Sequence, residues 1–314
     1  MSTNVLRAQG SWWVVDGDRA ARIPTTATTT AELLADRALV AEVAASGATA
    51  YDTAVDRLQA ESPVTTPCRV VAQLVNYRSH AQESGFDPQR IQPTFFRKAS
   101  GSVAASGGEI VKPDHVRLLD YEVELGLVIG APIPVGTQIT EATLADYVAG
   151  LVITNDVSAR DVQLTKTQFY EAKSYPTFTP VGPWLTLLDP EDFAHLLDLR
   201  LQLSVNDVLR QDRTVADMIH LPAPSLTALA RFQRLEPGDL VLTGTPGGTA
   251  LQAPPHVVEL VAHLLPAHVK WKVFFDKQEK NPRYLANGDR LSLTIRTHDG
   301  RIDLGRQQST VVAP

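Results

Sequence analysis

Short β-rich runs separated by glycine and proline constrain the fold of this chain more than any other feature. The runs are shorter than most helices and are rich in branched apolar residues, which favours strands. They are Arg69–Val75, Tyr121–Ile129, Leu151–Thr154, Trp184–Leu188, Leu199–Val205, Leu240–Thr243 and Leu291–Ile295. Helical patterns between them are brief, at Ala142–Tyr147 and Ser225–Phe232. The pattern predicts a mainly β, α+β protein that folds back on itself, in contrast to a doubly wound sheet.

Residues 1–65 carry a different pattern, which predicts a smaller α+β unit. The runs Ser11–Val15 and Ala20–Ile23 flank Asp16-Gly17, a pair typical of hairpin turns. From Thr30 to Ala45 apolar residues recur at helical spacing, and Thr30 is placed to cap that helix.

A linker rich in serine, threonine and proline follows this unit at residues 62–67. The pattern beyond it changes to the short β-rich runs. We therefore predict an N-terminal domain over 1–65 and a larger domain over 66–314.

The charge balance narrows the classes of partner. A net charge of −6 and a pI near 5.8 argue against nucleic acid, because phosphate binding requires a basic face. The N-terminus lacks the basic flank and apolar run of a signal peptide. No stretch reaches the roughly 18 apolar residues of a membrane span. We expect a cytoplasmic globular protein with neither a nucleic acid nor a membrane as partner.

Cys68 is the single cysteine of the chain, which excludes an intrachain disulfide and suits a reducing cytoplasm. A nucleophilic thiol is one interpretation. Its neighbourhood, Thr-Pro-Cys-Arg-Val-Val, is more typical of the residues that lead into a buried strand.

The most informative strand is the acidic one predicted at Asp120–Gly130, where side chains alternate between two faces. The apolar face carries Tyr121, Val123, Leu125, Leu127 and Ile129. The acidic face carries Asp120, Glu122 and Glu124, and then Gly126. This face is either a solvated outer surface, or a site where a cation offsets the repulsion and Gly126 leaves room for a ligand. Carboxylate oxygens without soft ligands nearby suit Mg²⁺ or Mn²⁺ better than zinc.

A second segment, Gly150–Gln163, begins as an apolar strand and then turns abruptly polar. Asp156 follows the strand, where a carboxylate can face a cleft. Ser158 and Asp161 have the spacing of a capping box, which predicts a short helix. The alternative is a plain turn followed by a surface ion pair between Arg160 and Asp161.

Five blocks in a fixed order resemble the fumarylacetoacetate hydrolase family. Glu122-Val-Glu124 and Asn155-Asp-Val-Ser-Ala-Arg-Asp-Val-Gln163 are the first two blocks of the resemblance. The others resemble the family's histidine segment, its lysine-bearing loop and its glycine-rich segment, at Asn76–Glu83, Ala172–Pro183 and Leu235–Gly248. The resemblance covers roughly residues 69 to 250, with a weaker echo at Asn287–Leu293. It implies a mixed β-roll core that pairs into homodimers.

The resemblance also implies a divalent ion. In the family two glutamates and an aspartate hold it, and they correspond to Glu122, Glu124 and Asp156. Mg²⁺ or Mn²⁺ there would chelate two oxygens of a 2-oxo acid or β-dicarbonyl, polarise the carbonyl and stabilise an enolate leaving group.

The family's histidine–glutamate dyad corresponds to His80 and Glu83. At i and i+3 of a helical turn the two share a face, so the carboxylate can orient the imidazole and raise its basicity. Such a base could deprotonate water for attack on the distal carbonyl. The alternative is a surface helix pair.

Further residues are placed near the substrate by the same resemblance. Lys173 would meet the negative charge that develops on the substrate. Arg160 and Gln163 would bind carboxylate or carbonyl oxygens, Thr245 the substrate carboxylate, and Tyr77 of the histidine segment another part of the substrate. The glycines of 244–248 lack the spacing of a nucleotide loop and indicate a tight turn where backbone approaches a ligand.

The chain departs from the family at residues 250–287, where a short connection is replaced by about forty residues. This insertion includes His256–Leu265 and Trp271–Phe275. It could shape the substrate pocket or extend a subunit interface.

Three functions remain open from the sequence. The first is hydrolysis of an acylpyruvate or a fumarylacetoacetate-like diketo acid, which the His80–Glu83 dyad favours. The second is decarboxylation or isomerisation of a related 2-oxo acid of the oxaloacetate type. The third is metal binding without turnover, against which the intact set of site residues argues.

Overall fold

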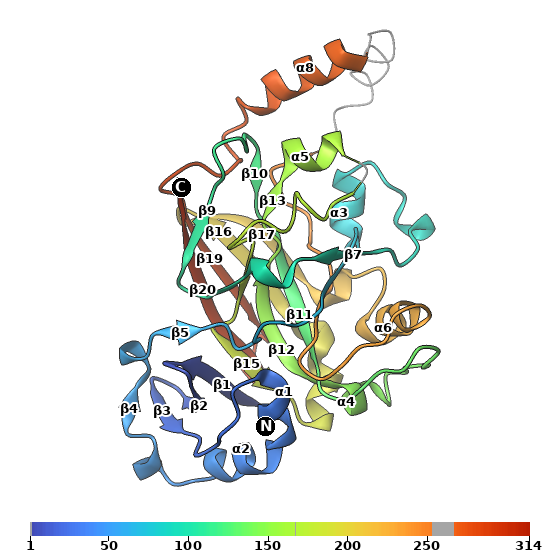
Figure 1. Ribbon diagram of the computed structural model, residues 1–314. Helices are drawn as coiled ribbons and strands as arrows, with labels where there is room; N and C mark the ends of the chain where they lie inside the picture. The colour runs from blue at the N-terminus through green and yellow to red at the C-terminus, as the bar shows by residue number, and fades with distance from the viewer. Residues whose placement is uncertain (1, 167, 253–266) are drawn as a thin grey trace.

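The computed structural model describes residues 2–166, 168–252 and 267–314 (Figure 1). Its main sheet runs in the order β4-β3-β2-β1-β15-β12-β11-β18-β6-β7. The bounds are β1 Thr3–Ala8, β2 Ser11–Asp16, β3 Arg19–Arg22, β4 Thr53–Ala54, β6 Val70–Gln73, β7 Phe95–Lys98, β11 Val123–Ile129, β12 Val148–Asn155, β15 Trp184–Leu187 and β18 Leu240–Leu242. Three short strands join its sides, β5 Ala60–Glu61, β8 Val103–Ala105 and β14 Thr179–Val181.

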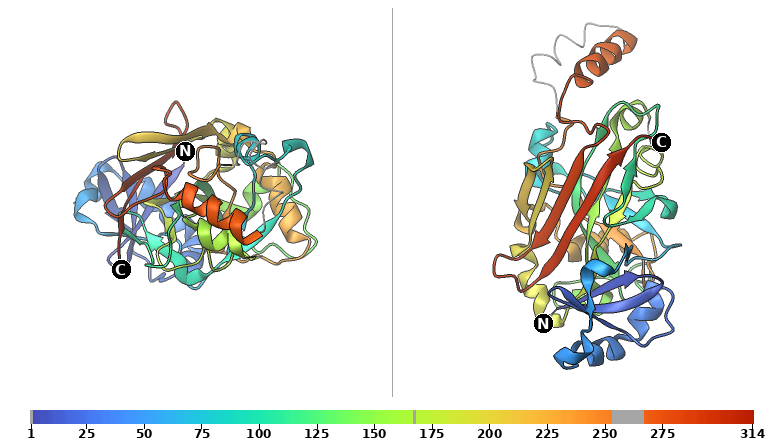
Figure 2. Two further views of the ribbon diagram at one scale, coloured as in Figure 1. Left: turned by 90° about the horizontal axis from the view of Figure 1, so that it is seen from above. Right: turned by 90° about the vertical axis from the view of Figure 1, so that its left-hand side faces the viewer.

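A second sheet closes over one face of the main sheet (Figures 1 and 2). Its order is β17-β16-β19-β20-β9, and a separate pair joins β10 to β13. The bounds are β9 Glu109–Val111, β10 Leu119–Asp120, β13 Ser158–Ala159, β16 Arg200–Val205, β17 Val208–Thr214, β19 Arg290–Arg296 and β20 Asp303–Val312. Leu125, Leu201 and Leu293 share one apolar core, so the two sheets are held together by apolar burial.

The helices are short and lie around the sheets (Figure 1). They are α1 Thr30–Ala35, α2 Arg37–Ala44, α3 Arg78–Glu83, α4 Leu144–Tyr147, α5 Arg160–Thr165, α6 Pro222–Ala230 and α8 Ala267–Gln278. Sheet-rich architecture with few helices confirms the predicted fold class. None of the described helices is long and apolar enough to cross a membrane.

Strand β11 is buried on both faces, so the solvated outer face considered from the sequence is wrong. Leu125 and Leu127 enter the core between the sheets, whereas Val128 packs into a second apolar cluster with Leu240. Gly126 leaves no room for a ligand either. A Cβ at Gly126 would lie 2.6 Å from Val152 Cγ2 and 3.1 Å from Leu240 Cδ1, because neighbouring side chains fill that space.

The N-terminal unit differs from its prediction at the helix. The expected helix from Thr30 to Ala45 is interrupted at Asp36 and forms α1 and α2. Thr29, and not Thr30, is the N-cap, and it forms a capping box with Glu32. The Thr30 hydroxyl instead donates to Pro63 O at 2.9 Å, which ties the helix to the linker.

Strand β1 was not expected, and it connects the N-terminal unit to the rest of the chain. It pairs on one side with β2 and on the other with β15, in register from Thr3↔Leu187 to Leu6↔Trp184. Residues 1–65 therefore extend the main sheet. The division into domains over 1–65 and 66–314 stays a prediction.

Part of the insertion forms α8, which projects away from the two sheets (Figures 1 and 2). The expected run at 271–275 falls within this helix. The apolar run His256–Leu265 lies outside the described residues.

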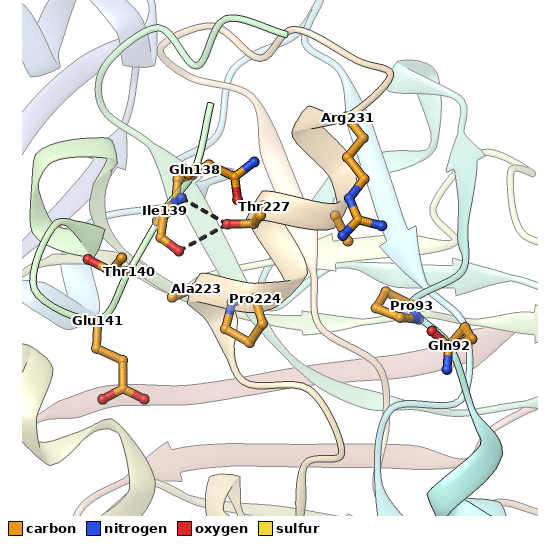
Figure 3. A pocket seen from close by; sticks show the side chains of 11 residues that line it. Gln92, Pro93, Gln138, Ile139, Thr140, Glu141, Ala223, Pro224, Thr227 and Arg231 are labelled. Atoms are coloured by element: carbon orange, nitrogen blue, oxygen red, sulfur yellow. Dashed lines mark hydrogen bonds between the residues drawn. The ribbon is translucent and has the colours of Figure 1, made fainter. Parts of the chain in front are cut away.

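Helix α6 also borders a hollow of about 530 Å³, which opens between it and residues 138–141 (Figure 3). Thr227 joins the two sides, because its Oγ1 accepts from Ile139 N at 2.8 Å and donates to Ile139 O at 2.9 Å. None of the site residues predicted from the sequence lines this hollow.

Candidate active site

Three carboxylates meet where β11 begins and β12 ends. The strands pair antiparallel with Val123 opposite Asn155, so Glu122 and Asp156 flank the last pair. Asp156 N donates to Glu122 O at 2.9 Å, and Glu122 N donates to Asn155 Oδ1 at 3.0 Å. Glu122, Glu124 and Asp156 each offer an oxygen within 4.8 Å of the others. The structure thus brings together the three residues predicted to hold a metal.

Two lysines neutralise part of this charge. Lys173 Nζ donates to Glu122 Oε2 at 2.6 Å and to Asp156 Oδ2 at 2.7 Å. Lys98 Nζ contacts Asp156 Oδ1 and donates to Phe178 O at 3.0 Å. Lys98 was missed in the sequence. The sequence feature that could have indicated Lys98 as a site residue is its place at the end of the run Phe95-Phe-Arg-Lys98. This run belongs to an otherwise buried sheet.

Arg160 lies on the other side of Glu122. Its Nε donates to Asp120 Oδ2 at 2.8 Å, its Nη1 donates to Gln163 Oε1 at 2.8 Å, and its Nη2 contacts Glu122 Oε1. The hydrogen bond to Gln163 therefore fixes Arg160, which in turn orients the predicted metal ligand Glu122. The contact of Arg160 and Gln163 with substrate oxygens stays a prediction.

The predicted capping box of the α5 helix is wrong. Ser158 Oγ donates to Asp156 O at 2.9 Å and does not cap the helix. The Asp161 carboxylate is used elsewhere, because Arg117 N donates to it at 3.0 Å. Backbone groups of another segment compete for Asp161, and a backbone oxygen two residues earlier competes for Ser158, which the capping-box spacing did not show.

Asp120 is a second residue missed in the sequence as a site member. Its carboxylate is fully buried and accepts hydrogen bonds from Ala250 N at 2.8 Å and Leu251 N at 3.1 Å, besides Arg160. It thereby joins the end of the glycine-rich segment to the arginine beside Glu122.

Glu124 has no cationic partner among the described residues. Its Oε2 accepts from Gly244 N at 2.7 Å, and the carboxylate is 1% exposed. Burial, and then the charges of Asp156 and Glu122, raise the pKa of Glu124 well above its usual range.

The surroundings of Glu122 have the opposite effect. Burial alone would raise the pKa of Glu122, but Lys173 and Arg160 outweigh it and the net shift is downward. For Lys173 itself, burial lowers the pKa, and Asp156 and Glu122 raise it by more. The cluster as a whole contains the buried acids Asp120, Glu122, Glu124 and Asp156 and the buried bases Lys98, Arg160 and Lys173.

Acidic groups therefore outnumber basic groups in this cluster, and Glu124, whose pKa is raised, is the acid without a cationic partner among the described residues. Three convergent carboxylates with an unpaired member are the ligand chemistry of a hard divalent cation. The donor set fits Mg²⁺ or Mn²⁺ and contains no thiolate or imidazole ligand within the triad.

The histidine and glutamate of α3 lie close to this cluster but do not hydrogen-bond to each other in the described residues. His80 Nδ1 is buried without a partner, while Glu83 Oε2 accepts from Gly248 N at 2.7 Å. Burial lowers the pKa of His80 and outweighs the attraction of Glu122 and Glu83. The charge of Glu83 does raise the pKa of His80, as expected of the dyad, but desolvation lowers the pKa by more.

Tyr77 and Thr245 are held within the fold. Thr245 Oγ1 donates to Val123 O at 3.0 Å and accepts from Gln211 Nε2 at 2.9 Å. The Tyr77 ring is fully buried, and its hydroxyl has no partner among the described residues. Binding of substrate by either residue stays a prediction.

The glycine-rich segment makes the tight turn expected of it. Gly244 has φ +86°, and a Cβ there would lie 2.8 Å from Asn76 Cβ. Only glycine fits this conformation and spacing without strain. The turn lets Gly244 N approach Glu124, so backbone reaches a predicted metal ligand.

Comparison with known proteins agrees with this arrangement. The family model described as "Fumarylacetoacetate (FAA) hydrolase C-terminal" matches residues 69–312. A relative from Sphingomonas sp. (strain SKA58), "2,4-didehydro-3-deoxy-L-rhamnonate hydrolase", is 36% identical over 201 residues, which are 64% of this chain and 68% of that protein.

Solved structures match over nearly the whole chain. That of a "probable 2-hydroxyhepta-2,4-diene-1,7-dioate isomerase" from Mycobacterium abscessus has a TM-score of 0.74 and 26% identity, and covers 100% of this chain and 99% of that one. Maleylpyruvate hydrolase from Sphingobium sp. SYK-6, solved with manganese(II) and pyruvate, has a TM-score of 0.73 and 22% identity over 99% of each chain, and shows likeness of fold. The chain therefore belongs to the fumarylacetoacetate hydrolase family, whose enzymes act on small-molecule oxo acids.

Proposed function

We propose that this protein is a hydrolase dependent on Mg²⁺ or Mn²⁺ that cleaves a carbon–carbon bond in a diketo acid, such as an acylpyruvate or a fumarylacetoacetate-like compound. The observation that carries the proposal is the buried triad of Glu122, Glu124 and Asp156, with one member left without a cation. Burial of three carboxylates, one of them without a cationic partner, lowers the stability of the fold, so a structural role alone does not explain the triad.

The triad would hold the ion, with Lys98 and Arg160 keeping two of its carboxylates in place. When bound, the divalent ion supplies Lewis-acid polarisation of a carbonyl oxygen. Lys173 Nζ already lies between Glu122 and Asp156, so its ammonium can stabilise negative charge that develops on a substrate oxygen beside them.

His80 is suited to accept a proton from water. Its lowered pKa keeps the imidazole neutral at pH 7, which is the form that a general base requires. Glu83 would stabilise the imidazolium by its charge. The water proton passes to His80, and the water oxygen forms a bond to the distal carbonyl carbon while the π-electron pair moves to the carbonyl oxygen. When the carbonyl re-forms, the carbon–carbon bond breaks, its electron pair leaves as the enolate of the 2-oxo acid, and the enolate carbon takes up the proton held by His80.

Isomerisation or decarboxylation of a related 2-oxo acid is the second candidate. It is favoured by the likeness to the Mycobacterium abscessus structure assigned as a dioate isomerase. Stabilisation of an enolate by Lys173 would serve either reaction, but water activation by His80 serves hydrolysis alone.

The test is turnover of a panel containing acylpyruvates, fumarylpyruvate and oxaloacetate, with Mg²⁺ or Mn²⁺ and with EDTA. Loss of the diketone enol absorbance and release of CO₂ are the two readouts. We expect metal-dependent cleavage of a diketo acid. His80→Ala should abolish it and retain metal binding, whereas His195→Ala, in the 3₁₀ helix Pro190–Asp198, should leave it unchanged. Turnover of oxaloacetate alone would replace hydrolysis with the second candidate.

A further inference from the structure

One glutamine reaches from an edge strand of the second sheet into the candidate active site. Strand β17 lies at one edge of that sheet (Figure 1), and Gln211, 1% exposed, is its only buried residue. β17 comes close to the glycine-rich segment because Gly248 has no side chain. A Cβ at Gly248 would lie 2.1 Å from Arg210 O. A buried amide requires hydrogen-bond partners, so those of Gln211 show what this residue holds.

The partners of Gln211 lie on two segments of the site. Its Oε1 accepts from Val123 N at 3.0 Å, and its Nε2 donates to Thr245 Oγ1 at 2.9 Å and to Pro246 O at 2.8 Å. Thr245 Oγ1 in turn donates to Val123 O at 3.0 Å. Gln211 and Thr245 therefore hold both backbone polar groups of Val123, which is the residue between the two glutamates of the triad.

These two side chains act where β11 lacks a neighbouring strand on one side. β18 pairs with β11 only from Gly126 to Val128, and the chain then leaves the sheet at the turn of Gly244. The same register, continued, would place Thr245 opposite Val123. Side chains therefore take the place of a strand at the end of β11 that bears the predicted metal ligands.

A glutamine suits this position because its amide is neutral. Acidic groups already outnumber basic groups in the adjacent cluster, so a further carboxylate would add to their repulsion. A carboxylate would also lack the N–H groups that Gln211 donates to Thr245 and Pro246. Gln211 thus fixes the backbone of the acidic strand without adding a charge to it.

We propose that Gln211 is a positioning residue that holds Glu122 and Glu124 in the arrangement that binds a divalent ion. The inference rests on the proposed function, in which the triad holds this ion. Gln211 acts through Val123 and is not itself one of the ligands. Partners of this kind orient metal ligands, and their loss weakens metal binding about 10- to 100-fold. The same amide holds Thr245, so it also keeps the glycine-rich segment fixed relative to the ligands.

The experiment titrates Mn²⁺ by calorimetry into metal-free wild type, Gln211→Met and Gln307→Met. Methionine keeps the length of the side chain and removes its amide. Gln307 is the matched control, because it is also buried and its Nε2 reaches from the second sheet to Ile153 O, Pro180 O and Gly182 O at 3.2, 3.2 and 3.1 Å. None of these oxygens belongs to a triad residue or to its neighbour in sequence.

We expect Gln211→Met to weaken Mn²⁺ binding about 10- to 100-fold and Gln307→Met to leave it unchanged. Both variants should lower the thermal midpoint of the metal-free protein, because each leaves buried backbone groups unpaired. Thr245→Val is a milder variant, which releases Val123 O and keeps the Gln211 amide on Val123 N. It should weaken Mn²⁺ binding on the order of 3- to 10-fold, as for one neutral hydrogen bond. If Gln211→Met does not fold, Thr245→Val decides.

Wild-type affinity in Gln211→Met and Thr245→Val, or an equal loss of affinity in Gln211→Met and Gln307→Met, would overturn the role of Gln211. If the wild type still cleaves a diketo acid in a metal-dependent way, the proposed hydrolase stands without that role. If the expected losses of affinity occur and no diketo acid is cleaved, the hydrolase fails and the role of Gln211 survives. Absence of Mn²⁺ binding by the wild type would overturn both.

Discussion

The two ends of strand β11 are equally buried and chemically opposite. Glu122, immediately before the strand, and Glu124, near its beginning, are 5% and 1% exposed, whereas Leu127 and Ile129 near its end are 1% and 0% exposed. The apolar end packs between sheets, and the hydrophobic effect stabilises it. The charged end requires Lys98, Arg160 and Lys173 to offset its desolvation and still leaves Glu124 unpaired.

The difference shows that burial alone does not distinguish a core from a site. Both ends exclude water, but the apolar end adds to the free energy of unfolding while the charged end subtracts from it. A charged cluster that is buried and incompletely neutralised is explained by a ligand, whereas the leucines need none. Substitutions at the two ends should therefore separate activity from stability.

The largest effect is expected at Glu124. Glu124→Gln should lower kcat on the order of 10³-fold, because electrostatic stabilisation at the reacting centre is lost. The same change removes an unpaired buried carboxylate, so the thermal midpoint should stay the same or rise. Steady-state kinetics and calorimetric melting measure the two quantities. A Glu124→Gln protein that retains the wild-type kcat and has a lower thermal midpoint would show that the charged end of β11 serves stability and not activity.

Removal of a cation should act on stability first. Lys98→Met leaves Asp156 with one buried partner fewer and should lower the free energy of unfolding by about 4 kcal/mol without metal. Added Mn²⁺ should restore part of this loss, since it supplies positive charge to the same carboxylate. Urea denaturation with and without Mn²⁺ measures both values. A loss that Mn²⁺ does not reduce would mean that Lys98 acts apart from the triad.

At the apolar end the effect should be confined to stability. Leu127→Ala should lower the free energy of unfolding by about 3 kcal/mol through lost burial and a cavity. Its kcat at 25 °C should match that of the wild type while the protein remains folded. A fall in kcat comparable to that of Glu124→Gln would show that the two ends of β11 are not separable.

Cys68 tests burial of an ionisable group outside the charged cluster. Burial raises the pKa of the Cys68 thiol to about 11, since the Ser100 hydrogen bond only partly opposes it. The thiolate is the reactive form and is disfavoured below this pKa, so alkylation at pH 8 should be about 100-fold slower than for an exposed thiol. The rate should rise with pH up to about 11. Iodoacetamide labelling followed by mass spectrometry measures it, and fast labelling at pH 8 would place the thiol in a more polar setting.

The residue patterns left a solvated face and a cation site open, and the family resemblance supplied the triad of Glu122, Glu124 and Asp156. Glu122 immediately precedes β11, Glu124 lies within it and Asp156 follows β12, so the register of these two neighbouring strands suffices to join them. The resemblance to a family supplied His80, Glu83 and Lys173. The dimeric state implied by the same resemblance stays a prediction.

What the sequence did not show depends on contacts between distant segments. Lys98 reaches Asp156 across 58 residues, through the pairing of β7 with β6 and of β6 with β18. Asp120 was read as one more acid of a strand face, although its role follows from the backbone of Ala250 and Leu251. The expectation that Gly126 leaves room for a ligand was wrong for the same reason, because side chains from β12 and β18 occupy the space beside it.

The central claim is that the charged end of β11 is built around a divalent cation. Calorimetric titration of Mn²⁺ into protein stripped with EDTA tests it most directly, with Glu124→Gln as the matched variant. The account predicts saturable binding by the wild type and at least a tenfold weaker affinity for Glu124→Gln, because loss of even an outer-shell partner weakens metal binding about 10- to 100-fold. Absence of binding to the wild type, or equal affinity for the two proteins, would contradict it.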